Sequence, residues 1–94
     1  MKIREVIWLE SVIEKLERKH HVTQDEVEEL LSSHPRFFWM EEGKVNGEDV
    51  YVALGRSIAG RKLAVFFIYK KNRDIIILSA RDMTRRERKR YEKK

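Results

Sequence analysis

Two apolar runs separated by a short polar turn are the strongest constraint on how this chain can fold. Residues 63–69 read Leu-Ala-Val-Phe-Phe-Ile-Tyr, and residues 75–78 read Ile-Ile-Ile-Leu. Apolar side chains at successive positions are typical of a strand that is covered on both faces. The intervening residues 70–74 are too few for a crossover, so the two strands must pair antiparallel.

Two helices are expected before these strands. In residues 10–20 the apolar positions fall at helical spacing among charged residues, which predicts an amphipathic helix. Thr23 and Glu26 form a capping-box pattern at the start of a second helix, which ends before Pro35 because proline disfavours a helical residue ahead of it. Residues 6–8 could add a short opening strand.

Two further strands are expected between the helices and the apolar runs. Residues 37–41 lead to a turn at either 42–44 or Asn46-Gly47, and residues 50–54 alternate in the way a strand does. Residues 55–60 are expected to form the next turn. The predicted fold class is therefore α+β: two N-terminal helices packed on a three- to four-stranded antiparallel sheet, with a basic C-terminal helix, in one domain covering residues 1–94.

Composition removes several classes of protein. At 94 residues the chain can bury one core, and the absence of cysteine excludes disulfides, thiolate catalysis and cysteine zinc sites. No apolar stretch approaches the roughly 20 residues that span a membrane, and charges interrupt the N-terminal segment, so a cytoplasmic protein is expected. The carboxylates at helical spacing near the start lie among lysines and arginines, as on a solvated face, which argues against a divalent-metal nuclease; no cofactor is predicted.

The basic C-terminal segment, residues 81–94, makes a polyanion the first partner to consider. It carries eight Lys and Arg against three carboxylates. Thr84 and Glu87 repeat the capping-box pattern, and Met83, Glu87 and Tyr91 form a stripe that should dock on the sheet. The residues expected to bind RNA are Arg61, Arg85, Arg86, Arg88, Lys89 and Arg90.

Three residues are the candidates for catalysis. Arg81 and Arg56 are expected at strand ends, where a guanidinium can bind a phosphate bidentately and stabilise charge that develops as it reacts. His20 is the candidate proton shuttle because histidine titrates near neutral pH. The alternative for each of these arginines, and for Arg61, is a salt bridge to the acidic helices, and the alternative for His20 is a helix cap or a surface position. Most aromatic side chains are expected in the core.

The chain resembles the BrnT family of bacterial toxins. At the C-terminus the resemblance rests on Ile-Leu-Ser-Ala-Arg (residues 77–81), the Arg- and Glu-rich residues 84–88 and Tyr91-Glu92. In the middle it rests on Gly-Arg-Ser (55–57) and Gly60-Arg61. Near the start it rests on Trp8 and Lys19-His20. It implies a fold like that of RelE-type ribonucleases. It also implies a toxin neutralised by a cognate ribbon-helix-helix antitoxin, BrnA-like, in a toxin-antitoxin heterotetramer. A homodimer is the other assembly expected, because so short a chain has marginal stability by itself.

The resemblance implies a specific reaction on RNA. Such toxins cut RNA without a metal, by attack of the 2'-hydroxyl on the adjacent phosphate. Arg81, Arg56 and His20 are the positions that match the family's reactive groups. Four departures bear on this activity: Leu9 stands where the family commonly has Asp, Val12 and Leu16 replace a frequent Lys and Asn, and His21 replaces Gly.

Two functions of different classes are therefore expected from the sequence. The first is a metal-independent endoribonuclease toxin of a type II toxin-antitoxin system. The second is a non-catalytic module that binds an antitoxin or nucleic acid through its basic face. The first predicts cleavage that depends on Arg81, and the second predicts binding without turnover.

Overall fold

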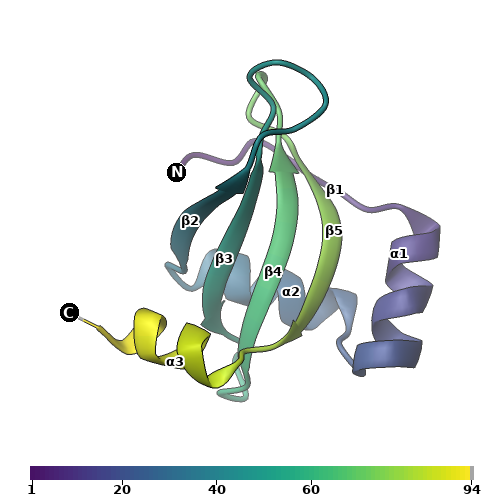
Figure 1. Cartoon of the computed structure of the whole chain (residues 1–94). Coiled ribbons are helices and arrows are strands. Elements are labelled where there is room, and N and C mark those ends of the chain that lie inside the picture. Colours follow the sequence, from purple (N-terminus) through teal and green to yellow (C-terminus); the bar gives the residue numbers. More distant parts are fainter. Residues whose placement is uncertain (94) are drawn as a thin grey trace.

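The computed structural model describes residues 1–93 and shows three helical regions around one twisted sheet (Figure 1). Lys94, the last residue of the basic segment, lies outside the described residues. In chain order the elements are β1 (Val6–Ile7), α1 (Glu10–Lys15), the π-helical turn η1 (Leu16–His20), α2 (Gln24–Ser32), β2 (Arg36–Glu41), β3 (Val50–Arg56), β4 (Lys62–Tyr69), β5 (Ile75–Asp82) and α3 (Arg85–Glu92).

The sheet has five strands in the order β1-β5-β4-β3-β2. Strands β2 to β5 form an antiparallel meander, and β1 pairs in parallel with β5. The α+β class is confirmed, with one more strand than the three or four expected, because β1 joins the far edge of the meander. Strand β4 lies in the middle of the sheet, as its uninterrupted apolar sequence predicted.

The helices are divided between the two faces of the sheet. Figure 1 shows α1 beside the sheet, α2 behind it and α3 in front of it. The main core lies on the side of η1 and α2, and a smaller cluster lies under α3. The buried members of the main core are Leu16, Val22, Val27, Leu30, Ala53, Leu63, Val65, Phe67, Ile75, Ile77 and Ala80.

Both predicted capping boxes are present. Thr23 and Glu26 exchange side-chain to backbone hydrogen bonds at the start of α2, and Thr84 and Glu87 do the same at α3. The predicted helix over residues 10–20 is also present, but its last turn widens into η1. The chain leaves η1 through His21, whose φ of 53° lies in the left-handed region that favours glycine.

Gly55 does not belong to a turn, as the sequence suggested, but lies inside β3. A Cβ atom at this position would lie 2.9 Å from Leu30 Cγ and 3.1 Å from Pro35 Cβ. Glycine therefore allows α2 to approach the sheet closely. The turn begins after Arg56, the last residue of β3, and there the Ser57 amide donates to the Arg61 carbonyl.

Strand β5 extends further than its apolar run. It continues to Asp82, so Arg81 lies within the strand and does not follow it. The pairing with β4 shifts register between Phe66 and Phe67, a β-bulge that accommodates the additional residue. The reason for the extension is the long partner strand β4, which supplies ladder hydrogen bonds to the polar end of β5. Between β2 and β3, residues 42–49 form one loop that includes both turns proposed from the sequence.

Candidate nucleic-acid interface

A row of opposed residues crosses the sheet beneath α3 and has an arginine at each end. Arg81 on β5 pairs with Ala64 on β4, Ala64 with Leu54 on β3, and Leu54 with Arg36 on β2. Since opposed residues in a sheet share a face, both arginines lie on the face that α3 covers. Arg36 donates to the carbonyl oxygens of Arg90 and Tyr91 at the C-terminal end of α3.

Arg81 is held by the first turn of α3 and by an aromatic ring. Its Nη1 and Nη2 atoms donate to the two carboxylate oxygens of Glu87 at 2.7 and 3.0 Å. The guanidinium carbon lies 5.0 Å from the centre of the Phe66 ring, close enough for a cation–π interaction. Its side chain nevertheless keeps 34% of its surface exposed. Arg81 is therefore oriented without being enclosed.

The ion pair fixes the charge of both partners. Hydrogen bonding to Glu87 raises the pKa of Arg81 above its ordinary value. Burial alone would raise the pKa of Glu87, but the hydrogen bonds from Arg81 and from the Thr84 amide outweigh it and lower that pKa. Both groups are thus charged at neutral pH. Glu87 caps α3 and orients Arg81 with the same carboxylate.

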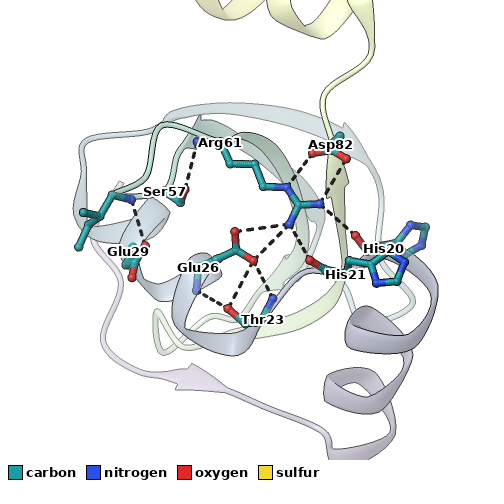
Figure 2. Close-up of polar contacts among 9 residues, drawn as sticks. His20, His21, Thr23, Glu26, Glu29, Ser57, Arg61 and Asp82 are labelled. Carbon is teal, nitrogen blue, oxygen red and sulfur yellow. Dashed lines mark hydrogen bonds and ion pairs between the residues drawn. The ribbon is translucent and has the colours of Figure 1, made fainter.

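Arg61 occupies a closed site on the other side of β5 (Figure 2). Nε and Nη2 donate to the carboxylate of Asp82 at 2.9 and 3.3 Å. Nη1 donates to the His21 carbonyl at 2.6 Å and to Glu26, and Nη2 donates also to the His20 carbonyl at 3.0 Å. These contacts join the start of β4, the end of β5, the end of η1 and the cap of α2. Every edge of this guanidinium is used within the protein.

The Arg61 site also explains the charge of Asp82 and the place of His20. The hydrogen bond from Arg61 lowers the pKa of Asp82, and positive charge on His20 contributes in the same direction. His20 is half-buried beside this pair, with its carbonyl bound to Arg61. Figure 2 shows the imidazoles of His20 and His21 directed away from the Arg61 guanidinium.

The structure places the three catalytic candidates at one end of the sheet but on two of its faces. Arg81 and Arg56 share the α3 face, because Arg56 on β3 alternates with Leu54 and lies opposite Lys62. Arg56 and Arg81 stand two strands and two residues apart, which is about 12 Å between their Cα atoms at the spacings of a β-sheet. His20 lies on the opposite face, where Asp82 meets Arg61. Arg56 is exposed.

The basic residues of α3 form an exposed surface next to Arg81, and all five that were predicted to bind RNA are exposed: Arg85, Arg86, Arg88, Lys89 and Arg90. The predicted docking stripe is confirmed, since Met83 is buried and Tyr91 packs on the smaller cluster. Arg90 lies over the Phe38 ring, 3.7 Å from its centre. The charges of α3 therefore stand on a docked helix.

Sequence reasoning missed the double use of both capping-box glutamates. Glu26 binds Arg61 and Glu87 binds Arg81, although each glutamate was assigned only a helix cap. Arg61 lies 35 residues from Glu26 in the sequence, so no spacing rule connects the two residues. Arg81 and Glu87 lie six residues apart across a strand end, which is not a helical spacing. Only the packing of α3 brings them together.

None of the helices formed by residues 1–93 has the length and apolar character that crossing a membrane requires. A search of curated proteins gives no significant match. Among solved structures, the fold is similar to the 1.1 Å crystal structure of the Brucella abortus ribonuclease toxin, BrnT. That match has a TM-score of 0.62 and 20% sequence identity, and covers 89% of this chain and 100% of the other.

The sequence profile of one family covers most of the chain. Residues 8–87 match the profile of the ribonuclease toxin BrnT of type II toxin-antitoxin systems. The matched range includes Arg61 and the residues that it contacts. It also includes the Arg81–Glu87 pair and the capping box of α2. The chain therefore belongs to the BrnT family of ribonuclease toxins of type II toxin-antitoxin systems.

Proposed function

We propose that this chain is a metal-independent endoribonuclease that uses Arg81 to stabilise the reacting phosphate. The 2'-hydroxyl of RNA attacks the adjacent phosphorus while its proton passes to a base. The bond to the 5'-oxygen breaks and that oxygen takes up a proton, which leaves a 2',3'-cyclic phosphate and a 5'-hydroxyl. Negative charge gathers on the phosphorane oxygens, where a fixed cation is most effective.

The observation that carries the proposal is the unused edge of the Arg81 guanidinium. Glu87 accepts from the Nη1 and Nη2 atoms, and the Asp82 carbonyl accepts from Nη1. Among residues 1–93 no acceptor binds Nε, so the Nε–Nη2 edge can bind two phosphate oxygens while Glu87 stays in place. A guanidinium that is held beforehand loses less side-chain freedom when the phosphate arrives.

Arg61 supports the proposal by contrast. It was predicted to bind RNA, but its donors already meet Asp82, Glu26 and two carbonyl oxygens. A phosphate would have to displace these partners. We assign Arg61 the role of fixing the end of η1 and the end of β5, which positions His20 and Arg81.

The proton-transfer group in the proposal is His20, and Arg56 is a second cation. Because β5 ends at Asp82, an RNA strand that passes around this end would meet Arg81 and Arg56 on one face and His20 on the other. The exposed basic residues of α3 would hold the phosphates of the same strand by counterion release. A cytoplasmic location and a BrnA-like ribbon-helix-helix antitoxin complete the proposed function, with the antitoxin covering the basic face.

The test is cleavage of a single-stranded RNA by purified protein in the presence of a metal chelator. The expected products end in a 2',3'-cyclic phosphate, and Arg81→Ala should reduce the cleavage rate by about a hundredfold or more. Arg18→Ala, which removes an exposed arginine from η1, is the matched control and should cleave at the wild-type rate. An unchanged rate in Arg81→Ala would contradict the role of Arg81. RNA binding without products would favour the non-catalytic module.

A further inference from the structure

The outer edge of β2 is open and apolar. β2 is the last strand in the sheet order, and the other edge strand, β1, has only two residues. Figure 1 shows β2 as one margin of the sheet. Its central residues are Phe37, Phe38, Trp39 and Met40, with none of the lysines or prolines that protect exposed edges. An edge of this kind has backbone donors and acceptors ready to pair with another strand.

Exposed apolar side chains gather at this edge. Trp39 is 54% exposed and Met40 is 43% exposed, and Val45 in the following loop is 54% exposed. Three of the six large hydrophobic residues exposed among residues 1–93 therefore lie on β2 or on the loop that leaves it. Large aromatic residues at an edge are costly in water, and pairing with a second strand would cover them.

The sequence of β2 is complementary to itself when two copies run antiparallel. A two-fold axis perpendicular to the sheet keeps the faces aligned, so residues of the same face must stand opposite each other. With the axis at Phe38, Phe38 faces its own copy and Phe37 faces Trp39. Phe37 and Trp39 share one face, because they pair with Ala53 and Tyr51 on β3.

The β-bulge at the end of β2 completes this register. Pairing with β3 passes from Trp39–Tyr51 directly to Glu41–Val50, which places Glu41 on the same face as Phe38 and Arg36. In the proposed register Arg36 of one copy lies opposite the bulge of the other and faces its Glu41. The strand thus has a cation at its first residue and a carboxylate at its last, so each end finds the opposite charge.

Charge complementarity extends beyond the strand. The start of β2 lies beside the C-terminal end of α3, where Arg36 binds the carbonyls of Arg90 and Tyr91. β2 ends at Glu41, and the loop that follows it begins at Glu42. Antiparallel pairing places the acidic loop of each copy next to the basic α3 of the other.

We propose that β2 is the interface of a homodimer in which a second copy of this chain pairs antiparallel with the first, centred on Phe38. The two sheets then join into one, and the exposed Trp39 of each copy is covered by Phe37 of the other. The dimer is independent of RNA cleavage. It places the two α3 helices on the same face of the joined sheet.

The first test is the molar mass of the purified chain, without antitoxin, by sedimentation velocity. The expected mass is twice the 11.4 kDa of one chain. Trp39→Lys places a charge next to the two-fold axis of the interface and should give a monomer with an unchanged far-ultraviolet circular dichroism spectrum. Ile58→Lys is the matched control, because Ile58 is 86% exposed in the β3–β4 turn, and it should remain dimeric.

The register is tested by cysteine crosslinking, which is unambiguous because the natural chain has no cysteine. Phe38→Cys stands opposite itself and should form an intermolecular disulfide in mild oxidant, since opposed Cα atoms in a sheet lie within disulfide reach. Phe37→Cys alone should not crosslink, but an equimolar mixture with Trp39→Cys should. A monomeric wild-type chain would overturn the proposal, and so would a dimer that survives Trp39→Lys. Pairing of this edge only with an antitoxin strand would overturn it as well.

Discussion

The guanidinium of Arg81 donates two hydrogen bonds to the carboxylate of Glu87, at 2.7 and 3.0 Å. The same carboxylate accepts the Thr84 amide at 2.9 Å and so caps α3. Glu26 repeats this arrangement at α2, where it accepts from the Thr23 amide at 3.0 Å and from Arg61 at 3.3 Å. In both places an arginine holds the first turn of a helix: Arg81 lies within β5, and Arg61 directly precedes β4. In each place, therefore, one carboxylate sets the orientation of both the helix and the arginine that binds it.

Glu87→Gln should strengthen RNA binding. Glutamine still accepts the Thr84 amide, but it no longer places a negative charge beside the phosphate that Arg81 would bind. A partly exposed ion pair contributes about 0.2–1 kcal/mol, so affinity should rise by up to about fivefold. Fluorescence anisotropy with a labelled, non-cleavable RNA measures the change. Weaker binding by Glu87→Gln would show that Glu87 serves the site mainly by orienting Arg81.

The free energy of unfolding should fall in acid. The pKa values of Glu87 and Asp82 are lowered from their ordinary 4.5 and 3.8, so the folded state binds fewer protons than the unfolded state. Their contribution is complete above pH 4.5 and is lost as the pH falls through the folded pKa values. Urea unfolding between neutral pH and pH 3 measures this loss, and Glu87→Gln should show a smaller pH dependence. An identical pH dependence in the variant would refute the assignment to Glu87.

Arg61→Ala should destabilise the fold strongly. It leaves the His20 and His21 carbonyls without this donor and removes the partner of Asp82. Loss of hydrogen bonds to a charged group costs about 1.5–3 kcal/mol, measurable by urea unfolding. Arg56→Ala is the control, because Arg56 is exposed at the end of β3 and its loss should change stability by less than about 0.5 kcal/mol. Equal effects of the two substitutions would contradict the closed Arg61 site.

His21→Gly should stabilise the protein. His21 has a φ of 53°, and the left-handed conformation costs a residue with a Cβ atom about 1–2 kcal/mol. Glycine removes that cost but gains freedom in the unfolded chain, so a net increase of up to about 1 kcal/mol is expected. Thermal unfolding monitored by circular dichroism measures it. Histidine in place of the family's glycine would then lower the stability of this chain. A lower thermal unfolding midpoint in His21→Gly would show instead that the imidazole makes a compensating contact.

Leu9→Asp should also stabilise the protein, through α1. Leu9 occupies the N-cap of this helix, is 47% exposed and gives no side-chain cap. An aspartate at an N-cap accepts a free amide of the first turn and contributes about 0.5–2 kcal/mol. Thermal unfolding is the measurement, and Leu9→Asn is the uncharged comparison. If Leu9→Asp changed the rate of RNA cleavage but not stability, the position would act in catalysis and not as a cap.

Two other departures from the family pattern have a structural explanation in the core. Leu16 is 1% exposed within the main cluster, and Val12 packs against that cluster. An apolar residue suits both environments, and a polar one there would need its own hydrogen-bond partners. These replacements therefore place apolar side chains where η1 and α1 pack on the sheet.

Local chemistry in the sequence determined most of the elements. Thr23 with Glu26 and Thr84 with Glu87 located the starts of two helices, since a capping box needs only residues three apart. The apolar run at residues 63–69 identified the central strand, because continuous hydrophobicity indicates cover on both faces. The short polar connections required antiparallel neighbours. Each of these inferences depends on interactions between residues that are near in the chain.

The tertiary structure decided the partners of the charged residues and the ends of the strands. Arg61 reaches Glu26 across 35 residues of sequence and Asp82 across 21, and no periodicity predicts such contacts. Gly55 resembles a turn residue in sequence, but the approach of Leu30 makes it necessary within β3. Propensity and patterning describe neighbours along the chain, whereas ion pairs and close packing depend on which surfaces meet when the helices dock on the sheet. That is why the sequence could propose Arg81 as the reactive arginine, and only the fold could show Glu87 on one edge of its guanidinium and no acceptor from residues 1–93 on the other edge.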